Sequence, residues 1–271
     1  MSREILEKYS IRAKKALWQN FLVDDLIVEE IAYSTTVTWE NIVEVGPGYG
    51  ALTEKLFNQN PKSLQLVELD TDMIEILNDR KKNGDFTLWD TQFNIHHIDV
   101  LKFQPDFEDW YNVIANIPYY ITSPILRHFL YDVDNKPKSM VILMQADVWD
   151  KILWSGKNKS SVLSLFIEKK CHVSEVIRVP NTSFIPAPKV ESSVLYFETH
   201  WDFHDVSDKN FLELIKKWFS EPRKKLSKNL MKHGFDKDIV LQVFNELEIW
   251  ENIRAEALDI YDWIDLTKKF Y

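Results

Sequence analysis

The feature that most constrains this fold is a regular alternation of short apolar runs with segments of helical periodicity. Helix-like patterns at 51–57 and 73–80 separate several of the apolar runs. Strands that alternate with helices form right-handed crossovers, and therefore a mainly parallel sheet with helices on both faces. The predicted strands of this sheet span residues 41–45, 64–69, 93–98, 112–116 and 140–144.

The pattern changes after this series. Two strand-like segments, His172–Val179 and Ser192–Phe197, are joined by a proline-rich loop that leaves no room for a helix, which predicts an antiparallel pair. Beyond Thr199, apolar residues recur at helical spacing. The sequence thus predicts an α/β domain at residues 1–199, with an antiparallel last strand, followed by a small helical domain at 200–271.

Composition limits the class of protein. A chain of 271 residues, of which 45% are hydrophobic, can bury a substantial core. Its one cysteine, Cys171, excludes an internal disulfide and indicates a reducing compartment. The N-terminal segment is charged and lacks an apolar signal core, and two early glutamates argue against a transit peptide. We therefore expect a cytoplasmic protein with no membrane partner. No metal site of the Cys/His type is expected, because His96 and His97 are adjacent and point to opposite faces of a strand.

The net charge of −9 argues mildly against a nucleic-acid partner, but the distribution of charge matters more than its sum. Between Lys216 and Lys232 there are seven Lys or Arg and one Glu. The stretch from Lys8 to Lys15 holds four bases and no acid. Both runs suit a nucleic-acid surface, and a solvated helix face is the alternative.

A glycine-rich turn follows the first predicted strand. Gly46, Gly48 and Ala51 let the backbone turn tightly and approach a ligand at the N-terminus of the next helix. This spacing fits both a nicotinamide dinucleotide and S-adenosylmethionine. Of the two carboxylates at the end of the second strand, Glu68 lies where a ribose-binding acid is expected, and Asp70 suits the N-cap of the following helix.

Two further motifs end the next strands. In S-adenosylmethionine enzymes an acid at the position of Asp99 takes the exocyclic amine of the cofactor's adenine; a cap or turn residue is the alternative. Asn116-Ile117-Pro118-Tyr119 presents an amide, a proline and an aromatic ring where a strand stops, which can hold a flat base, although Asn-x-Pro is also common turn chemistry. All these groups lie at C-terminal strand ends, where open α/β sheets bind ligands, and together they favour a methyltransferase over a dehydrogenase.

Taken in order, these motifs resemble those of the ribosomal RNA adenine N6,N6-dimethyltransferase family, in its small-subunit branch. The resemblance runs nearly from end to end of the chain. The segments that carry it are Gln19-Asn20-Phe21-Leu22, Glu44-Val45-Gly46-Pro47-Gly48, Glu68-Leu69-Asp70, Asp99, Asn116-Ile117-Pro118-Tyr119, the loop from Phe184 to Ser192, Arg223-Lys224-Lys225 with Asn229-Leu230, and Arg254-Ala255-Glu256.

The resemblance implies the Rossmann-like sheet of class I S-adenosylmethionine methyltransferases, with S-adenosylmethionine as cofactor. The residues it assigns to the cofactor are Asn20, Leu22, Gly46, Gly48, Glu68, Asp99 and Asn116. The residues it places against the target adenine are Ile117, Pro118, Tyr119 and Phe184, and its catalytic residues are Asn116 and Tyr119. Phe184 is alternatively a packing residue of the proline-rich loop. The residues implied to bind RNA are Arg223, Lys224, Lys225 and Lys228.

The implied activity is N6,N6-dimethylation of adenines in small-subunit, 16S-type rRNA, linked to ribosome biogenesis, by a monomer whose partner is the small ribosomal subunit. The chemistry suits the residues. Adenine N6 is a poor nucleophile because its lone pair is delocalised into the ring, and the Asn116 amide oxygen with the Ile117 carbonyl can accept its two hydrogens. Two alternatives stay open: a large-subunit, 23S-type dimethyltransferase of the macrolide-resistance type, and a non-catalytic ribosome-assembly or nucleic-acid-binding factor with this fold.

The chain departs from the family pattern at several positions. Leu17-Trp18 stands where the family often has Phe-Gly, and Tyr120 stands where Asn is common. Ser160-Ser161 replaces a usual Tyr-Gly pair. These changes leave the cofactor and base motifs intact and concern the detailed contacts with RNA.

Overall fold

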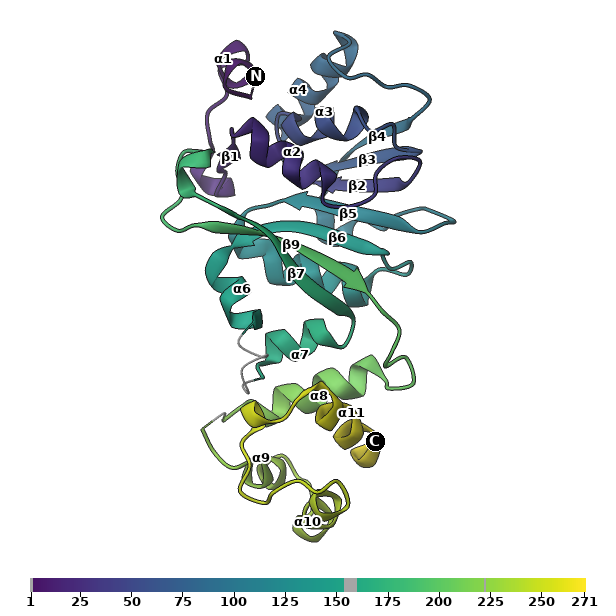
Figure 1. Ribbon diagram of the computed structural model, residues 1–271, viewed down its shortest axis with the longest axis vertical. Helices are drawn as coiled ribbons and strands as arrows, with labels where there is room; N and C mark the ends of the chain where they lie inside the picture. Colours follow the sequence, from purple (N-terminus) through teal and green to yellow (C-terminus); the bar gives the residue numbers. More distant parts are fainter. Residues whose placement is uncertain (1, 154–159, 222) are drawn as a thin grey trace. The chain divides into compact units, whose positions relative to one another are not determined.

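A computed structural model of the chain describes residues 2–153, 160–221 and 223–271 (Figure 1). The side chains outside this description include those of Tyr119, Lys151 and Leu153. The chain divides into two compact units, of which the first consists of Met1–Asp147 with Val173–Thr199 and the second of Val148–His172 with His200–Tyr271. The predicted division after residue 199 coincides with one passage between the units, whereas residues 148–172, assigned to the first domain from the sequence, cluster with the second unit.

Among the described residues, seven strands form the main sheet, in the order β4-β3-β2-β5-β6-β9-β7. Their bounds are β2 Asn41–Val45, β3 Ser63–Glu68, β4 Gln92–His97, β5 Tyr111–Asn116, β6 Ser139–Gln145, β7 Cys171–Val179 and β9 Ser192–Thr199. The first five run parallel to their neighbours, and β9 is antiparallel to β6. The predicted Rossmann-like α/β architecture with an antiparallel last strand is therefore confirmed, with strand ends within one or two residues of those expected.

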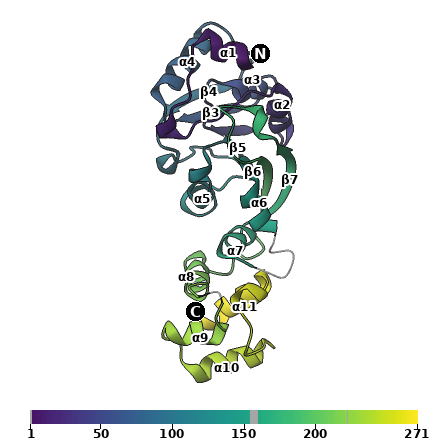
Figure 2. The ribbon, with the colours of Figure 1, turned by 90° about the vertical axis from the view of Figure 1, so that its left-hand side faces the viewer.

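Helices cover both faces of this sheet, and α2 and α5 lie on opposite sides of it in Figure 2. The helices of the first unit are α1 (Ser2–Lys8), α2 (Asp25–Tyr33), α3 (Ala51–Phe57), α4 (Thr71–Lys82), α5 (Thr122–Arg127) and the π-helical turn η4 (His128–Asp132). Short 3₁₀ turns are η1 (Lys15–Leu17), η2 (Val100–Lys102), η3 (Tyr119–Ile121) and η6 (Asn181–Ser183).

The core lies between the sheet and the helices that cover it. Fully buried apolar side chains of α2 and α3 pack against those of the central strands, among them Ile31, Leu56, Ile42, Leu66 and Ile114. Burial of each such side chain stabilises the fold by about 1.5–3 kcal/mol relative to exposure. The apolar runs that identified the strands are thus the same residues that fill the core.

Aspartates begin two helices next to the ligand-binding edge of the sheet. Asp70 accepts a hydrogen bond from the Asp72 N–H at 3.0 Å and is the N-cap of α4, which confirms its predicted role. Asp24 accepts from the N–H groups of Leu26 and Ile27 and is the N-cap of α2. Each cap satisfies donors that the first helical turn leaves unpaired, which typically contributes about 1 kcal/mol.

A second, two-stranded sheet was not predicted. It pairs β1 (Phe21–Leu22) with β8 (Phe184–Ile185) in antiparallel register. The Val23 N–H extends the pairing by donating to the Ser183 carbonyl at 2.8 Å. This small sheet joins the N-terminal Gln-Asn-Phe-Leu segment to the proline-rich loop, two segments more than 150 residues apart.

The second unit is helical in its described part. Its elements are α6 (Ala146–Leu153, which begins in the first unit), α7 (Val162–Glu168), α8 (Asp208–Trp218), α9 (Leu226–Lys232), α10 (Lys237–Glu246), η7 (Ala255–Ala257) and α11 (Ile260–Phe270). Trp218 and Trp263 are fully buried at its centre, with ring centroids 5.0 Å apart. The buried Lys169 ammonium pairs with Asp208 at 2.7 Å, because a charge in such a core requires a partner. No helix in the described part of the chain combines the length and apolar character needed to cross a bilayer.

Candidate active site

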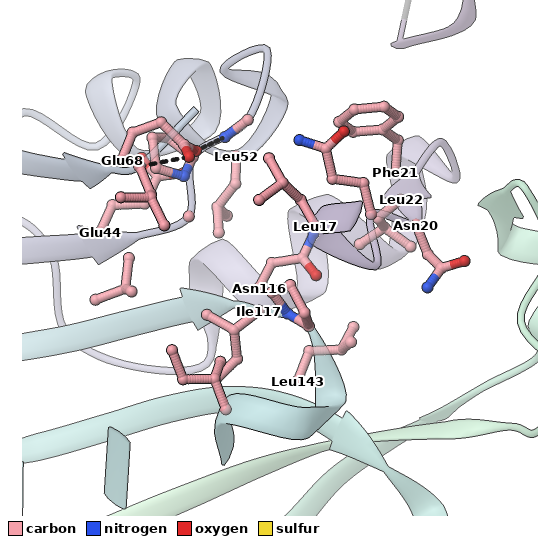
Figure 3. Close-up of a pocket in the computed structure, with 18 of the residues that line it drawn as sticks. Leu17, Asn20, Phe21, Leu22, Glu44, Leu52, Glu68, Asn116, Ile117 and Leu143 are labelled. Carbon is pink, nitrogen blue, oxygen red and sulfur yellow. Dashed lines mark hydrogen bonds between the residues drawn. The ribbon is translucent and has the colours of Figure 1, made fainter. Parts of the chain in front are cut away.

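A pocket opens at the C-terminal edge of the parallel strands, within the first unit (Figure 3). Its wall is built from the turn after β2, the loops after β3, β4 and β5, the N-terminal segment at 17–22, and Phe184. The predicted residues that line it are Asn20, Leu22, Gly46, Gly48, Glu68, Asp99, Asn116, Ile117, Pro118 and Phe184. The structure therefore brings the predicted cofactor residues to one cavity.

Gly46 sets the distance between the glycine turn and β5. Its φ of +67° lies in the left-handed region, and a Cβ atom there would approach the Asn116 carbonyl oxygen to 3.0 Å. Any side chain at this position would therefore meet backbone that cannot move aside. The absence of a side chain lets the turn pack directly against the end of β5, which places the glycine turn and Asn116 on the same pocket.

Glu68 is held by three backbone donors at the end of β3. Its Oε1 accepts from the N–H groups of Leu69 at 2.7 Å and Asp70 at 2.8 Å, and its Oε2 accepts from the Gly48 N–H at 3.2 Å. Burial raises the pKa of Glu68, and these three bonds oppose that rise. Since a carboxylate has about four acceptor sites, Glu68 retains capacity for a ligand hydroxyl group while it braces the glycine turn.

Glu44 is a pocket residue to which the sequence analysis gave no role. It lies in β2 and is 1% exposed, and the Thr53 hydroxyl donates to its Oε2 at 2.8 Å. Burial raises the pKa of Glu44 to about 8, the Thr53 bond opposes the rise, and the charge of Glu68 adds to it. The carboxyl is therefore largely neutral at pH 7. The sequence did contain a signal for a role of Glu44 in the pocket: it is an acid within an apolar strand that leads into a glycine turn.

The N-terminal segment is tied to the loop after β3. Gln19 Nε2 donates to Asp70 Oδ2 at 2.7 Å, and Lys14 Nζ donates to Asp70 Oδ1 at 2.5 Å. These bonds hold the segment that carries Asn20 and Leu22 at the pocket wall. Leu22 is buried there, and Figure 3 shows the Asn20 amide directed away from Glu68.

Asp99 and Asn116 both keep free hydrogen-bonding capacity. Asp99 Oδ1 accepts from the Leu101 N–H at 3.0 Å and caps η2, while its second oxygen has no partner among the described residues. The Asn116 side chain, half-buried at the end of β5, makes no hydrogen bond within the described part of the chain. Asp99 is thus a cap, as one alternative predicted, and still offers one acceptor to a ligand.

The remaining predicted base-binding residues differ in their surroundings. Ile117 is buried beside Asn116, and Pro118 follows it into η3. Phe184 is 3% exposed in β8, belongs to the hydrophobic core of the first unit and also lines the pocket, so it packs in the core while its contact with the base stays a prediction. The side chain of Tyr119, the predicted stacking and catalytic residue, lies outside the described part of the structure.

The predicted RNA-binding residues line a hollow in the second unit. Arg223, Lys224, Lys225 and Lys228 are joined there by two further cations, Lys232 and Arg254, and by Asn252 and Glu221. The ammonium groups of Lys224 and Lys232 both contact the Glu221 carboxylate and lower its pKa to about 2. Six cations around one acid give this hollow a strong positive charge. Lys232 belongs to the basic run identified in the sequence but was not among the four residues assigned to RNA.

The second unit contains a candidate metal-binding cluster that no local sequence motif indicates. His172, His200 and Asp202 each bring one donor atom within 4.8 Å of the others, a set that suits a divalent transition metal. The only adjacent histidines in the sequence, His96 and His97, take no part in it. Residues up to 30 positions apart supply the cluster, so spacing alone could not predict it.

Comparisons with known proteins place this pocket in context. The family model described as ribosomal RNA adenine dimethylase matches residues 10–270. The chain is 37% identical to ribosomal RNA small subunit methyltransferase A of Mycoplasma mobile, over 91% of this chain and 94% of that protein. It is also 37% identical to the protein of the same name from Aliarcobacter butzleri, over 92% of each chain.

Solved structures have the same fold. A dimethyladenosine transferase from Plasmodium falciparum superposes with a TM-score of 0.78 at 24% identity, covering 92% of this chain and 98% of that one. The 23S rRNA methyltransferase ErmE superposes with a TM-score of 0.70 at 18% identity, covering 92% and 99%. With a family model that spans nearly its whole length and a pocket at the expected strand edge, the chain belongs to the ribosomal RNA adenine dimethylase family.

Proposed function

We propose that the protein transfers two methyl groups from S-adenosylmethionine to the N6 atom of an adenine in small-subunit rRNA. The observation that carries the proposal is the meeting of Glu68, Asp99 and Asn116 with the glycine turn on one pocket of a chain from this family. The choice of subunit is supported by the relatives from Mycoplasma mobile and Aliarcobacter butzleri, whose names specify the small subunit.

The polar groups of the pocket suit S-adenosylmethionine, which supplies an electrophilic methyl group on a sulfonium centre. Glu68 offers its remaining acceptor sites to the ribose hydroxyls of the cofactor. The free oxygen of Asp99 accepts from the exocyclic amine of the cofactor's own adenine. The glycine turn lines the same cavity, and Gly46 lets it lie directly against Asn116, whose carbonyl oxygen a Cβ at this position would approach to 3.0 Å. Buried Glu44, largely neutral at pH 7, keeps a second negative charge away from Glu68.

Asn116 supplies the group that orients the nucleophile. Its amide oxygen and the Ile117 carbonyl accept the two N6 hydrogens of the target base, which favours a pyramidal nitrogen with its lone pair directed at the methyl group. The same acceptors stabilise the positive charge that develops on N6 during transfer. No general base of unusual strength is required, because the product ammonium loses its proton readily to solvent.

The target adenine must be unstacked from its neighbours, in single-stranded or extruded RNA, before it can enter this pocket. The cationic hollow lined by Arg223, Lys225, Lys228 and Arg254 in the second unit suits the phosphate backbone, whose contacts depend on salt rather than sequence. We place the activity in the cytoplasm, on the small ribosomal subunit, and assign it to a monomer. Size-exclusion chromatography with light scattering tests the last point.

The subunit assignment is tested with separated ribosomal subunits that lack the modification. The protein is incubated with methyl-labelled S-adenosylmethionine and each subunit in turn, and label is measured in the RNA. Label confined to the small subunit supports the proposal. Label confined to the large subunit selects the 23S-type alternative, and label in neither, with RNA still bound, selects the non-catalytic binding factor.

A further inference from the structure

Trp18 adopts a backbone conformation that suits glycine. Its φ of 52° and ψ of 35° lie in the left-handed region, which bulky residues rarely occupy. The Trp18 side chain is 70% exposed, so core packing does not offset the strain. The strained position is fixed through its backbone, since the Trp18 N–H donates to the Lys15 carbonyl and the Trp18 carbonyl accepts from Asn20.

A second exposed aromatic residue lies on the same pocket. Tyr120, in η3 after β5, is 59% exposed. Both rings line the pocket that holds Asn116, although they come from segments about 100 residues apart. Two unburied rings beside a base-binding site match the stacking platforms that bind single-stranded nucleic acid.

Two cations without an ion-pair partner among the described residues lie just before Trp18 in the chain. Of the four bases between Lys8 and Lys15, Lys8 pairs with Asp85, and Lys14 pairs with Asp70 and Asp72. Arg12 and Lys15 are exposed and form no ion pair with any residue that the structure describes. Lys15 begins the 3₁₀ turn that ends next to Trp18, so a cation and a free aromatic ring are presented together.

We propose that Trp18 and Tyr120 form a second base-binding subsite, which stacks a nucleotide neighbouring the target adenine, while Lys15 and Arg12 contact its phosphates. The inference rests on the proposed function, because it takes the pocket to hold an adenine of single-stranded or extruded RNA. A stacked neighbour fixes the strand on both sides of the reacting base and so selects among adenines. This contact with RNA gives a function to an exposed side chain that packs against no core.

The test is Trp18→Gly, with Trp39→Gly as its matched control. Trp39 has the same left-handed conformation (φ 61°) and is 65% exposed, but it precedes β2 and is not part of the pocket. Both changes relieve backbone strain, so neither lowers the melting temperature. Only Trp18→Gly weakens RNA binding: the loss of one base–aromatic stack raises KM for small subunits about 5- to 150-fold. Trp18→Phe keeps a stacking ring and restores most of the affinity.

The affinity for S-adenosylmethionine shows whether Trp18 contacts RNA, as proposed, or instead packs over the bound cofactor. Calorimetry is expected to give the same Kd for the wild type and Trp18→Gly, and a matching loss of cofactor affinity would overturn the proposal. So would KM values for Trp18→Gly and Trp39→Gly that agree with the wild type. If the wild type methylates neither subunit, the proposed function fails, and anisotropy with a labelled oligoadenylate still decides whether Trp18 binds RNA.

Discussion

Glu44→Gln should make the protein lose less stability than the wild type as the pH rises toward 8. Glu44 is 1% exposed in β2, and burial raises its pKa to about 8. Glutamine has the same shape and can accept the hydrogen bond that Thr53 donates at 2.8 Å. The substitution therefore removes the titration of this group while it keeps the packing and the hydrogen bond.

The sign and size of the effect follow from proton linkage. In the unfolded chain the Glu44 carboxyl ionises near its ordinary pKa of 4.5, whereas in the folded protein it keeps its proton until about pH 8. The folded state binds more protons between these values, so the free energy of unfolding falls by about 1.4 kcal/mol for each pH unit. Between about pH 5.5 and about pH 7.5 the loss from this group comes to about 2.5 kcal/mol.

Urea unfolding at these two pH values measures the effect. The wild type is expected to lose about 2.5 kcal/mol more than Glu44→Gln over this interval. Glu75→Gln, a change at an exposed glutamate of α4, should behave like the wild type. If Glu44→Gln keeps the full pH dependence of the wild type, Glu44 is ionised in the folded protein and the reasoning from its burial is wrong.

Three further predictions concern the cofactor, the RNA and the support of the glycine turn. Glu68→Ala should weaken S-adenosylmethionine binding about 10-fold or more, as hydrogen bonds to a carboxylate are lost; equal affinity by calorimetry would remove its ribose role. Lys224→Glu with Lys225→Glu should weaken RNA binding and flatten its dependence on salt, and an unchanged salt slope would leave this run as a solvated surface. Arg80 is 2% exposed and donates to the carboxylates of Glu54 and Asp85 and to the carbonyls of Tyr49 and Gly50 in the glycine turn. Arg80→Met should therefore lower the free energy of unfolding by about 3–5 kcal/mol, measured in urea. A smaller loss would mean that these partners rearrange.

Much of the fold could be predicted because it depends on local patterns. An apolar run such as 112–116 identifies a buried strand, and a carboxylate before a helical pattern, as at Asp70, identifies an N-cap. The order of strands and helices then fixes a parallel sheet, and a parallel sheet places its ligand at the C-terminal strand ends. These rules place Glu68, Asp99 and Asn116 at one ligand site, and in the structure all three line one pocket.

The parts that could not be predicted depend on contacts between distant segments. Gln19 bonds to Asp70 across 51 positions, and β1 pairs with β8 across more than 150. Neither contact leaves a periodicity in the sequence. The left-handed conformation of Trp18 could not be predicted either. Glycine commonly adopts a positive φ and would have indicated this conformation, whereas tryptophan rarely does.

The division into units shows the same limit. Residues 148–172 follow β6 and end at the start of β7, so their place in the sequence suggested the first domain. In the structure, Ser160 donates to the Leu258 carbonyl and Lys169 pairs with Asp208, which ties this segment to the C-terminal helices. Such long-range contacts, rather than sequence order, decide where a segment belongs.

The central claim is that Asn116 holds the adenine amine for two methyl transfers, and the methyl count on the product adenine tests it most directly. Small-subunit RNA is digested to nucleosides after reaction with the wild type or with Asn116→Ala, and N6,N6-dimethyladenosine is measured by mass spectrometry. We expect dimethyladenosine from the wild type and none from Asn116→Ala. The melting temperature of this variant stays unchanged, because the Asn116 amide has no partner among the described residues. Dimethyladenosine formed by Asn116→Ala at the wild-type rate would contradict it.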